Sequence, residues 1–372
     1  VRIMWRLFLP HNFLCFLKSL FYFLFSKKDN LKILFYTSSN FNRGEKNINY
    51  FIDPLYNLSL KNKINALVYE EPFLINNKNR SKNYIKADFL LFFILFFRKF
   101  LKGSFIERDR RIGAIFFKYF LNNKIENIVV LSNSLTSFFR GAYPNANIYD
   151  YQHGVIYSNH NGYIIDKNVP ENILKNNIKI LLFGKGFKQI LSNINTYYEK
   201  NSIVLGCCKP LNITHSNNKN YKLVTLQFTD DHTSEENNIL FDNLYNYLKN
   251  HSNFKFILKH HPRFKNNIND SKLISLPNVS FSKLSLIECF KLCDIHVTAY
   301  STTVFEAACL SIPSVFYSKF KSNIYLDDFN YPVPDSINEV NKNIINFGKI
   351  AKEWSKKYYE DLNKDKWIKL MS

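Results

Sequence analysis

The sequence is poor in cysteine: it has six in 372 residues, and no two of them form a Cys-x-x-Cys pair. That spacing is typical of structural zinc sites, and small secreted folds carry disulfides at a far higher cysteine density. We therefore expect buried, reduced thiols in a protein of the reducing cytoplasm. One Asp pair, Asp230-Asp231, is too little to indicate a metal, so we assign no metal site.

Zinc fingers, RNA-recognition signatures and a single dense basic helix are also missing, which excludes the common nucleic-acid-binding modules. The net charge is nevertheless +20, from 50 Lys and Arg against 30 Asp and Glu. Part of this charge reflects a general Asn and Lys bias. The remainder favours an anionic membrane surface or a phosphorylated ligand as partner, and no nucleic acid.

No hydrophobic run reaches the roughly 20 residues that a helix needs to cross a bilayer. Residues 1–26 are rich in aromatic side chains but are interrupted by Pro10 and Lys18, and no small-residue cleavage site follows them. Their Arg and Lys flanks suit a helix at a membrane interface, whereas an ordinary buried first helix is the alternative. The nine apolar residues 89–97 leave the same two alternatives. Basic residues follow them, and each Lys or Arg near an anionic leaflet contributes about 1 kcal/mol to the free energy of membrane binding.

The length suits two α/β domains rather than one core. Predicted strands alternate with helical stretches, which indicates parallel, doubly wound sheets. The predicted strands are 31–39, 66–69, 128–131, 147–151, 179–183, 223–228, 254–258, 279–281, 295–298 and 314–317. Residues 206–220 lose this periodicity and are rich in turn formers, so they are the predicted linker.

The predicted fold is therefore α/β, with two Rossmann-like doubly wound domains and an interdomain cleft. The first domain would cover 31–205 and the second 221–345. A membrane-associating or docking helix would precede them at 1–30, and a charged C-terminal helix would follow at 346–372. Ligands of such sheets bind beyond the carboxyl ends of the strands, which directs attention to the residues that follow each strand.

The strand 254–258 runs into Lys259, His261 and Arg263. Pro262 disfavours a helical conformation at His261 and gives the strand an extended exit. An imidazole there can donate to a phosphate oxygen or act as an acid, and the two neighbouring cations add positive charge. The alternative is a surface turn with incidental histidines.

The strand 295–298 runs into Ser301, Thr302 and Thr303, at the start of a predicted helix that carries Glu306. Free N–H groups and hydroxyls at a helix start attract an anion, and Glu306 is placed to accept hydrogen bonds from a ribose. A capping box, which is a purely structural pairing of a Ser or Thr with a Glu three residues later, is the alternative.

In the first domain, Asp150 and His153 stand at the end of the strand 147–151, with Gly154 offering a tight turn. His153 is a candidate general base for a hydroxyl acceptor. Asp150 either orients that histidine or is the base itself. A structural histidine is the alternative.

These elements resemble those of bacterial GT-B glycosyltransferases that build surface polysaccharides. The group includes capsule synthesis proteins, sialyl- and Kdo-transferases, and CDP-glycerol glycerophosphotransferases. The shared elements are His153-Gly154, His261-Pro262, and the turn Ser301–Thr303 followed by Glu306. The resemblance covers 147–163 and 254–318, and 1–130 agree only in general organisation.

The resemblance implies roles for these residues. His153 or Asp150 would be the base, His261 would bind the donor phosphate together with Ser301, Thr302 and Thr303, and Glu306 would bind the nucleotide ribose. Neither a metal nor a cofactor would be needed.

The implied function is transfer of a sugar from a nucleotide-activated donor to a hydroxyl of a lipid-linked or surface glycan precursor, for capsule or lipopolysaccharide. A CMP- or CDP-linked donor is favoured because the extended glycine motifs of enzymes that use UDP-GlcNAc are missing. The protein would work in the cytoplasm, peripherally at the inner face of the bacterial inner membrane. The alternatives are a polyol-phosphate transferase of the CDP-glycerol type, or a basic membrane-associated binding protein without catalysis.

Overall fold

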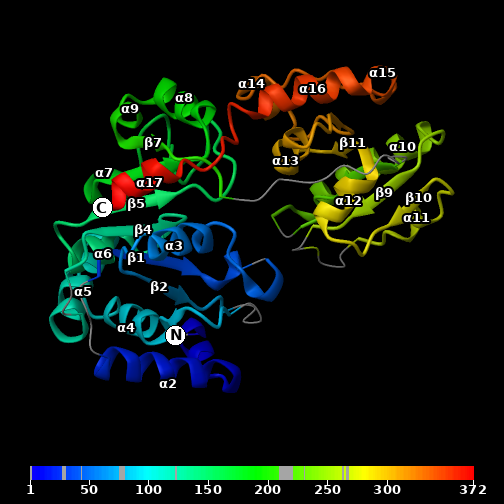
Figure 1. The fold of residues 1–372 in the computed structure, drawn as a ribbon. Helices are drawn as coiled ribbons and strands as arrows, with labels where there is room; N and C mark the ends of the chain where they lie inside the picture. Colours follow the sequence, from blue (N-terminus) through cyan, green and yellow to red (C-terminus); the bar gives the residue numbers. More distant parts are fainter. Residues whose placement is uncertain are drawn as a thin grey trace. The chain divides into compact units, whose positions relative to one another are not determined.

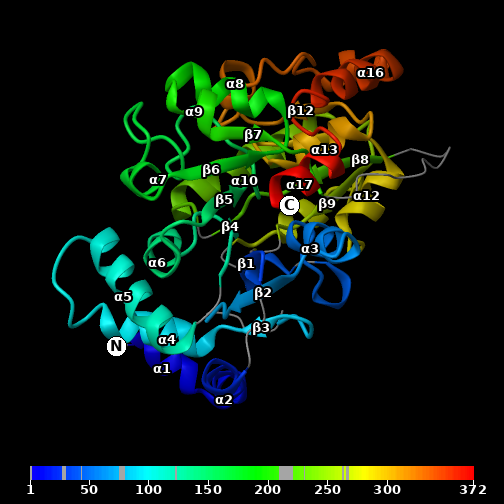
Figure 2. The ribbon, with the colours of Figure 1, turned by 60° about the vertical axis from the view of Figure 1, so that its left-hand side comes forward.

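The computed structural model describes residues 2–26, 31–42, 44–74, 80–121, 124–208, 221–229, 231–261, 264 and 268–372. The chain forms two compact units. Unit 1 comprises Val1–Lys209 and Glu360–Ser372, and unit 2 comprises Pro210–Tyr359. Each unit holds one parallel β-sheet covered by helices, so the fold is a two-domain α/β fold, as predicted (Figures 1 and 2).

Unit 1 has a seven-stranded sheet in the order β3-β2-β1-β4-β5-β6-β7. Its central strands are buried on both faces, as continuous apolar runs in a parallel sheet require. The strands are β1 (Ile33–Ser38), β2 (Ala66–Glu71), β3 (Ile85–Lys86), β4 (Asn127–Leu131), β5 (Asn147–Tyr151), β6 (Ile178–Leu182) and β7 (Ser202–Val204). The sequence had not indicated β3 and β7, the two short edge strands.

The helices of unit 1 cover its sheet and include a first segment, α1 (Arg2–Trp5), the short 3-10 turn Arg6–Phe8 and α2 (Pro10–Phe25). The others are α3 (Ile52–Lys61), α4 (Asp88–Phe97), α5 (Phe105–Phe120), α6 (Thr136–Ala142), α7 (Glu171–Asn176), α8 (Lys185–Ile194) and α9 (Tyr197–Asn201). In the described part of the chain, no helix has the length and apolar character that a bilayer crossing demands.

Helices α5 and α6 cross at two glycines. A Cβ built on Gly141 would lie 1.9 Å from the Arg110 carbonyl oxygen, and one on Gly113 would lie 2.0 Å from the Phe138 carbonyl oxygen. Any side chain at either position would collide with backbone, so these glycines set how closely the two helices approach.

Unit 2 has a five-stranded sheet in the order β10-β9-β8-β11-β12. The strands are β8 (Tyr221–Thr225), β9 (Phe256–Lys259), β10 (Val279–Phe281), β11 (Cys293–Thr298) and β12 (Ser314–Phe316). The helices are α10 (Ser234–Asn250), α11 (Ser271–Ile274), α12 (Leu286–Leu292), α13 (Thr303–Cys309), α14 (Asn323–Asp327), α15 (Ile337–Lys342) and α16 (Ile344–Ser355). The six cysteines all lie in the described residues and form no disulfide, and two of them, Cys289 and Cys293, belong to the core of this unit.

The tail differs from the single helix expected over 346–372. It contains α16 in unit 2 and a separate helix, α17 (Lys364–Met371), in unit 1. The chain between them turns at 356–358 and then passes the segment after β7, where the Cys207 N–H donates to the Glu360 carbonyl (2.8 Å). Buried Trp367 then fastens α17, because its ring nitrogen donates to the Ser59 hydroxyl (3.1 Å).

The predicted linker 206–220 begins too early, because unit 1 extends beyond residue 206. Residues 206–208 pack within unit 1, where Gly206 has φ of +100° and a Cβ would lie 2.2 Å from the Asp361 carbonyl oxygen. The remainder of the predicted linker, 209–220, lies outside the described residues.

Candidate functional site

A pocket of about 170 Å³ lies in unit 2 at the carboxyl ends of β8, β9 and β11. It brings together four of the residues singled out from the sequence, two of which follow or end β9 and two of which follow β11. Its lining residues are Thr225, Leu226, Gln227, Lys259, His260, His261, Leu286, Ser301 and Thr303. Lys259, His261, Ser301 and Thr303 are the expected members, although about 40 residues separate the two pairs in sequence.

The turn before α13 is held from several sides. The Ser301 N–H donates to the Thr298 hydroxyl (3.1 Å), and the Tyr325 hydroxyl donates to the Ser301 carbonyl (2.6 Å). The Thr303 hydroxyl donates to the Ser301 hydroxyl (2.8 Å). These contacts fix two hydroxyl groups at the wall of the pocket.

A capping box does not explain this turn. The helix begins after Thr302, whose side chain makes no cap hydrogen bond, and Glu306 therefore falls one position beyond the place that a capping box requires. Genuine capping boxes occur elsewhere in the chain, at Ser104, Thr233 and Ser285. A capping box at Thr302 is thus excluded, whereas the Ser301 hydroxyl accepts the Thr303 N–H (3.3 Å) and so has a local structural role as well.

His296, on β11, is a member of this site that sequence reasoning missed. It is fully buried, and its Nδ1 lies 2.8 Å from the Ser314 hydroxyl. Its Nε2 lies 2.9 Å from the Thr225 hydroxyl and 3.1 Å from the Thr303 hydroxyl. Burial lowers the pKa of His296 to about 3, so the ring is neutral at pH 7 and orients two pocket hydroxyls. A lone histidine between Ile295 and Val297 was the available signal.

The basic exit of β9 has two different histidines. His260 is stacked between Phe264 and Phe281, at ring-centroid distances of 3.9 and 4.7 Å, and its Nε2 lies 3.1 Å from the Asp270 carboxylate. Burial lowers the pKa of His260, although Asp270 opposes that shift. Both histidines line the pocket, but the ring of His260 is held in place by these contacts. His261, which is half-buried, is the histidine that the sequence predicted to bind the phosphate.

Some of the donor candidates do not line this pocket. Lys259 lines the pocket and donates from Nζ to the Leu284 carbonyl. Among the described residues, exposed Thr302 and half-buried Glu306 do not line this pocket. Pro262 and Arg263 lie outside the described residues.

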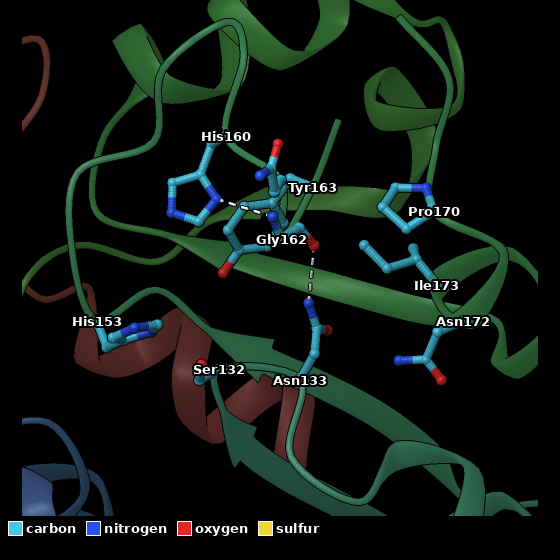
Figure 3. A pocket seen from close by; sticks show the side chains of 10 residues that line it. Ser132, Asn133, His153, His160, Gly162, Tyr163, Pro170, Asn172 and Ile173 are labelled. Carbon is cyan, nitrogen blue, oxygen red and sulfur yellow. Dashed lines mark hydrogen bonds between the residues drawn. The ribbon is translucent and has the colours of Figure 1, made fainter. Parts of the chain in front are cut away.

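A second pocket, of about 230 Å³, lies in unit 1 and includes His153 (Figure 3). Its lining combines hydroxyl, amide and imidazole groups with apolar side chains, from the ends of β4 and β5, the loop that follows β5, and α7. The lining residues are Ser132, Asn133, His153, His160, Asn161, Gly162, Tyr163, Pro170, Asn172 and Ile173. Such groups suit a ligand with several hydroxyls.

Asp150 does not line this pocket, because it is fully buried on β5. Its carboxylate accepts hydrogen bonds from the Asn133 N–H (3.0 Å) and the Tyr163 hydroxyl (2.8 Å), and both of these residues do line the pocket. Burial raises the pKa of Asp150 to about 7. The geometry makes Asp150 a support for two pocket walls.

The wall after β4 has an uncommon backbone. Ser132, Asn133 and Leu135 all have left-handed φ values, of +60°, +52° and +52°. Residues other than glycine adopt this conformation at a cost, and such strain collects at functional sites. The buried Asp150 carboxylate holds the turn through the Asn133 N–H, and the Asn133 side chain donates to the Gly162 carbonyl (3.1 Å; Figure 3).

The His153-Gly154 element is set by its neighbour Gln152. The buried Gln152 side chain accepts from the Phe183 N–H (2.8 Å) and donates to the Gly154 carbonyl (2.7 Å). The sequence predicts that Gly154 permits a tight turn through its conformational freedom. Gly154 has no left-handed φ, so that prediction is wrong. Among the described residues, no heavy atom lies within 4 Å of a Cβ built at Gly154.

The segment after β8 forms a separate contact. The His232 Nε2 pairs with the Tyr300 hydroxyl, and the His232 ring packs edge-on against Phe320. Across the described ranges, no three His, Cys, Asp or Glu side chains group closely enough to hold a metal ion.

Comparison with solved structures places the fold. The chain resembles UDP-GlcNAc 2-epimerase from Neisseria meningitidis bound to UDP-GlcNAc, with a TM-score of 0.56 and 11% identity, over 91% of this chain and 99% of that one. It resembles S. aureus MnaA in complex with UDP (TM-score 0.52, 11% identity, 91% and 95% covered). It also resembles the wall teichoic acid polymerase TagF (TM-score 0.52, 14% identity, 96% and 92% covered).

Comparison with protein-family models and with curated proteins gave no match. The structural likenesses establish the two-domain α/β fold, since at these identities they show the fold alone.

Proposed function

We propose that the protein is a transferase that moves a sugar from a nucleotide-activated donor to a hydroxyl acceptor. The observation that carries this proposal is the meeting of Lys259, His261, Ser301 and Thr303 in one pocket at the carboxyl ends of the unit 2 strands. Cations and fixed hydroxyls at that edge of a parallel sheet suit the phosphate of a nucleotide.

In this proposal unit 2 binds the donor. The Ser301 hydroxyl donates to a phosphate oxygen, and the Thr303 hydroxyl turns its proton from Ser301 to a second phosphate oxygen when the donor binds. Lys259 and His261 offset the negative charge that grows on the phosphate as the sugar departs. His296 acts through the Thr225 and Thr303 hydroxyls, so it is a positioning residue. We keep Arg263, Thr302 and Glu306 as proposed contacts to the rest of the donor, with Glu306 assigned to the ribose.

Unit 1 is proposed to present the acceptor. His153 takes the proton from the acceptor hydroxyl, the acceptor oxygen forms the new bond to the sugar carbon, and the nucleotide leaves with the electron pair of the broken bond. Of the two candidate bases, we keep His153, because Asp150 is fully buried and its carboxylate accepts hydrogen bonds from Asn133 and Tyr163. Protein groups supply all the charge stabilisation in this scheme, so it includes no metal.

The acceptor is proposed to be a lipid-linked or surface glycan precursor, for capsule or lipopolysaccharide, handled in the cytoplasm. A CMP- or CDP-linked donor is favoured by the missing glycine motifs. The likeness to structures holding UDP-GlcNAc and UDP is a reason to test uridine nucleotides beside the cytidine ones.

Transfer of a polyol phosphate is the second candidate. It is favoured by the likeness to a wall teichoic acid polymerase, which extends over 96% of this chain. The two candidates share the donor phosphate site and differ in the group that is transferred.

Product mass separates them. The protein is incubated with a glycan acceptor and, in turn, with CMP-sugars, UDP-sugars and CDP-glycerol. The mass of the acceptor is then measured by mass spectrometry. The proposal expects a gain of one sugar residue with release of the nucleotide. A gain of glycerol phosphate would favour the second candidate. Full activity in both His153→Ala and His261→Ala would overturn the site, and turnover of no donor would overturn the enzymatic function.

A further inference from the structure

Helix α2 is apolar on both of its sides. One side is buried, where Phe16 packs on Phe89 of α4 (ring centroids 6.1 Å apart) and Phe23 packs on Tyr69 of β2 (5.4 Å). The other side faces away and carries Phe13, Leu14, Phe21, Leu24 and Phe25, which are 44–73% exposed. A surface helix of a globular protein normally turns charged and polar residues to water, so this outer side needs a partner.

More exposed rings lie beside α2, because Phe8 in the turn before it contacts Phe16 on the buried side of the helix (ring centroids 5.0 Å apart). Trp5, which is 67% exposed, contacts Phe8 (6.4 Å), and Phe8 contacts Phe92 of α4 (5.6 Å). From Phe92 the contacts run along α4 to exposed Phe96 and then to Phe100, which is 66% exposed. We call the outer side of α2, together with Trp5 and Phe100, the aromatic face. Both views place α2 at the outer margin of unit 1 (Figures 1 and 2).

The exposed charges of the segments that carry the aromatic face are positive. The first 28 residues contain five Arg and Lys and no Asp or Glu, and 89–106 contain three cations and no acid, although one of these cations, Arg98, is paired with Asp109 of α5 (2.6 Å). Lys18 is exposed near the middle of α2, and Lys99 and Lys102 are exposed after α4. The partner that matches this face is therefore apolar in one layer and anionic in the next.

We propose that the aromatic face docks on the surface of a bilayer that contains anionic lipids. An in-plane helix buries its apolar side at the boundary of headgroups and acyl chains, aromatic rings settle at headgroup depth, and lysines reach the anionic headgroups by extending their stems. The sequence left residues 1–26 and 89–97 open between a core helix and an interfacial one. The structure assigns both roles to α2, one on each side, and leaves α4 mainly in the core, with Leu90, Leu91 and Ile94 buried.

The inference goes beyond the proposed transfer reaction and is tested without any nucleotide. The full chain is sedimented with vesicles of phosphatidylcholine alone, or of phosphatidylcholine mixed with phosphatidylglycerol. The variants are Phe21→Ser with Phe25→Ser, and Lys18→Glu. The matched control is Ile239→Ser with Ile345→Ser, since these two apolar side chains are 46% and 75% exposed on helices of unit 2.

The wild-type chain and the control are expected to bind the mixed vesicles. The double Phe variant should bind at least about tenfold more weakly, because the strength of membrane binding scales with the buried apolar area. Lys18→Glu should weaken binding at low salt. Three results would overturn the proposal: no binding of the wild type to mixed vesicles, equal binding by the double Phe variant, or equal binding to phosphatidylcholine alone.

A second copy of the chain is the competing occupant of the aromatic face. Light scattering of the wild type and of the double Phe variant tests it. If the wild type is a dimer that binds no vesicles, and the double Phe variant is a monomer, then the aromatic face binds a second copy of the chain and not a lipid surface. The stabilisation by nucleotides is measured separately on the same variants, so that failure of the membrane proposal is distinguished from failure of the proposed function.

Discussion

The hydroxyl of Tyr163 donates a 2.8 Å hydrogen bond to the carboxylate of Asp150, a fully buried group in the sheet of unit 1. The other carboxylate oxygen accepts the Asn133 N–H at 3.0 Å. Asp150 thereby joins the turn after β4 to the loop after β5, and both segments line the pocket that includes His153. Substitutions at Asp150 should consequently act on stability and on the shape of this pocket.

Asp150→Asn should remove a pH dependence of stability. Burial raises the pKa of Asp150 to about 7 from its ordinary value of 3.8. A raised pKa means that the contribution of this carboxyl to stability is fully present below the ordinary value and is lost as the pH rises through the folded one. The loss between these two pH values is on the order of 4 kcal/mol.

Urea unfolding of the wild type and Asp150→Asn, across that pH range, measures this loss. Relative to the Asn variant, the wild type should lose stability as the pH rises. Tyr163→Phe serves as a companion, because losing a donor to the carboxylate should move the transition of Asp150 to higher pH. Parallel pH profiles for the wild type and Asp150→Asn would contradict the assignment.

His296 should give stability the opposite pH dependence. Burial lowers its pKa to about 3 from 6.5, so its contribution is present above pH 6.5 and is lost as the pH falls towards 3. The full loss is on the order of 5 kcal/mol. His296→Gln cannot titrate, so its free energy of unfolding should fall less on acidification than that of the wild type. If both fall equally, then His296 is not held neutral in the fold.

Gly141 and Gly154 should respond differently to alanine. At Gly141 the new Cβ would collide with the Arg110 carbonyl oxygen, so Gly141→Ala should cost roughly 3 kcal/mol, the upper end of overpacking penalties. At Gly154 the described residues leave open space, so Gly154→Ala should change stability by less than about 0.5 kcal/mol. Urea unfolding followed by circular dichroism checks both, and equal stabilities of the two variants would refute the crossing described for α5 and α6.

His153→Ala should lower kcat by about 10²- to 10⁴-fold, the usual contribution of a general base, without weakening the binding of the donor nucleotide. Steady-state kinetics on the identified donor, together with calorimetric titration of the nucleotide, separate the two effects. His251→Ala is the matched control, because this histidine packs on Tyr247 in unit 2, away from the lining of either pocket. A kcat that His153→Ala leaves unchanged would exclude His153 as the base.

Much of the fold was predictable because buried parallel strands are continuous apolar runs, as in β4 and β6. The edge strands β3 and β7 were missed, since two or three half-buried residues carry no such pattern. The tail was misjudged because its last helix is fixed by contacts between distant positions, namely Trp367 with Ser59 and Glu360 with Cys207. A local sequence pattern does not predict contacts between such distant positions.

The candidate site was predictable where polar residues follow strands, as at His261 and Ser301. The partners of those residues were not predictable, because they depend on which strands become neighbours. His296 reaches Thr225 only because β11 pairs with β8, and Asp150 reaches Asn133 only because β5 pairs with β4. The sequence therefore indicated groups at the strand ends, and the structure distinguishes the groups that line a pocket from those that support it.

The central claim is that the pocket of unit 2 holds the phosphate of a nucleotide. Its most direct test is a thermal-unfolding screen with CMP, CDP, UDP and GDP on the wild type, on Thr303→Val and on the control Thr196→Val, at an exposed position of unit 1. Both substitutions remove one hydroxyl, but only Thr303 lines the pocket. A ligand at about 100 times its Kd stabilises a protein by about 2.7 kcal/mol.

At least one nucleotide should raise the Tm of the wild type and of Thr196→Val, and it should raise that of Thr303→Val much less. A Tm that no nucleotide raises, or an equal rise in both variants, would contradict the claim.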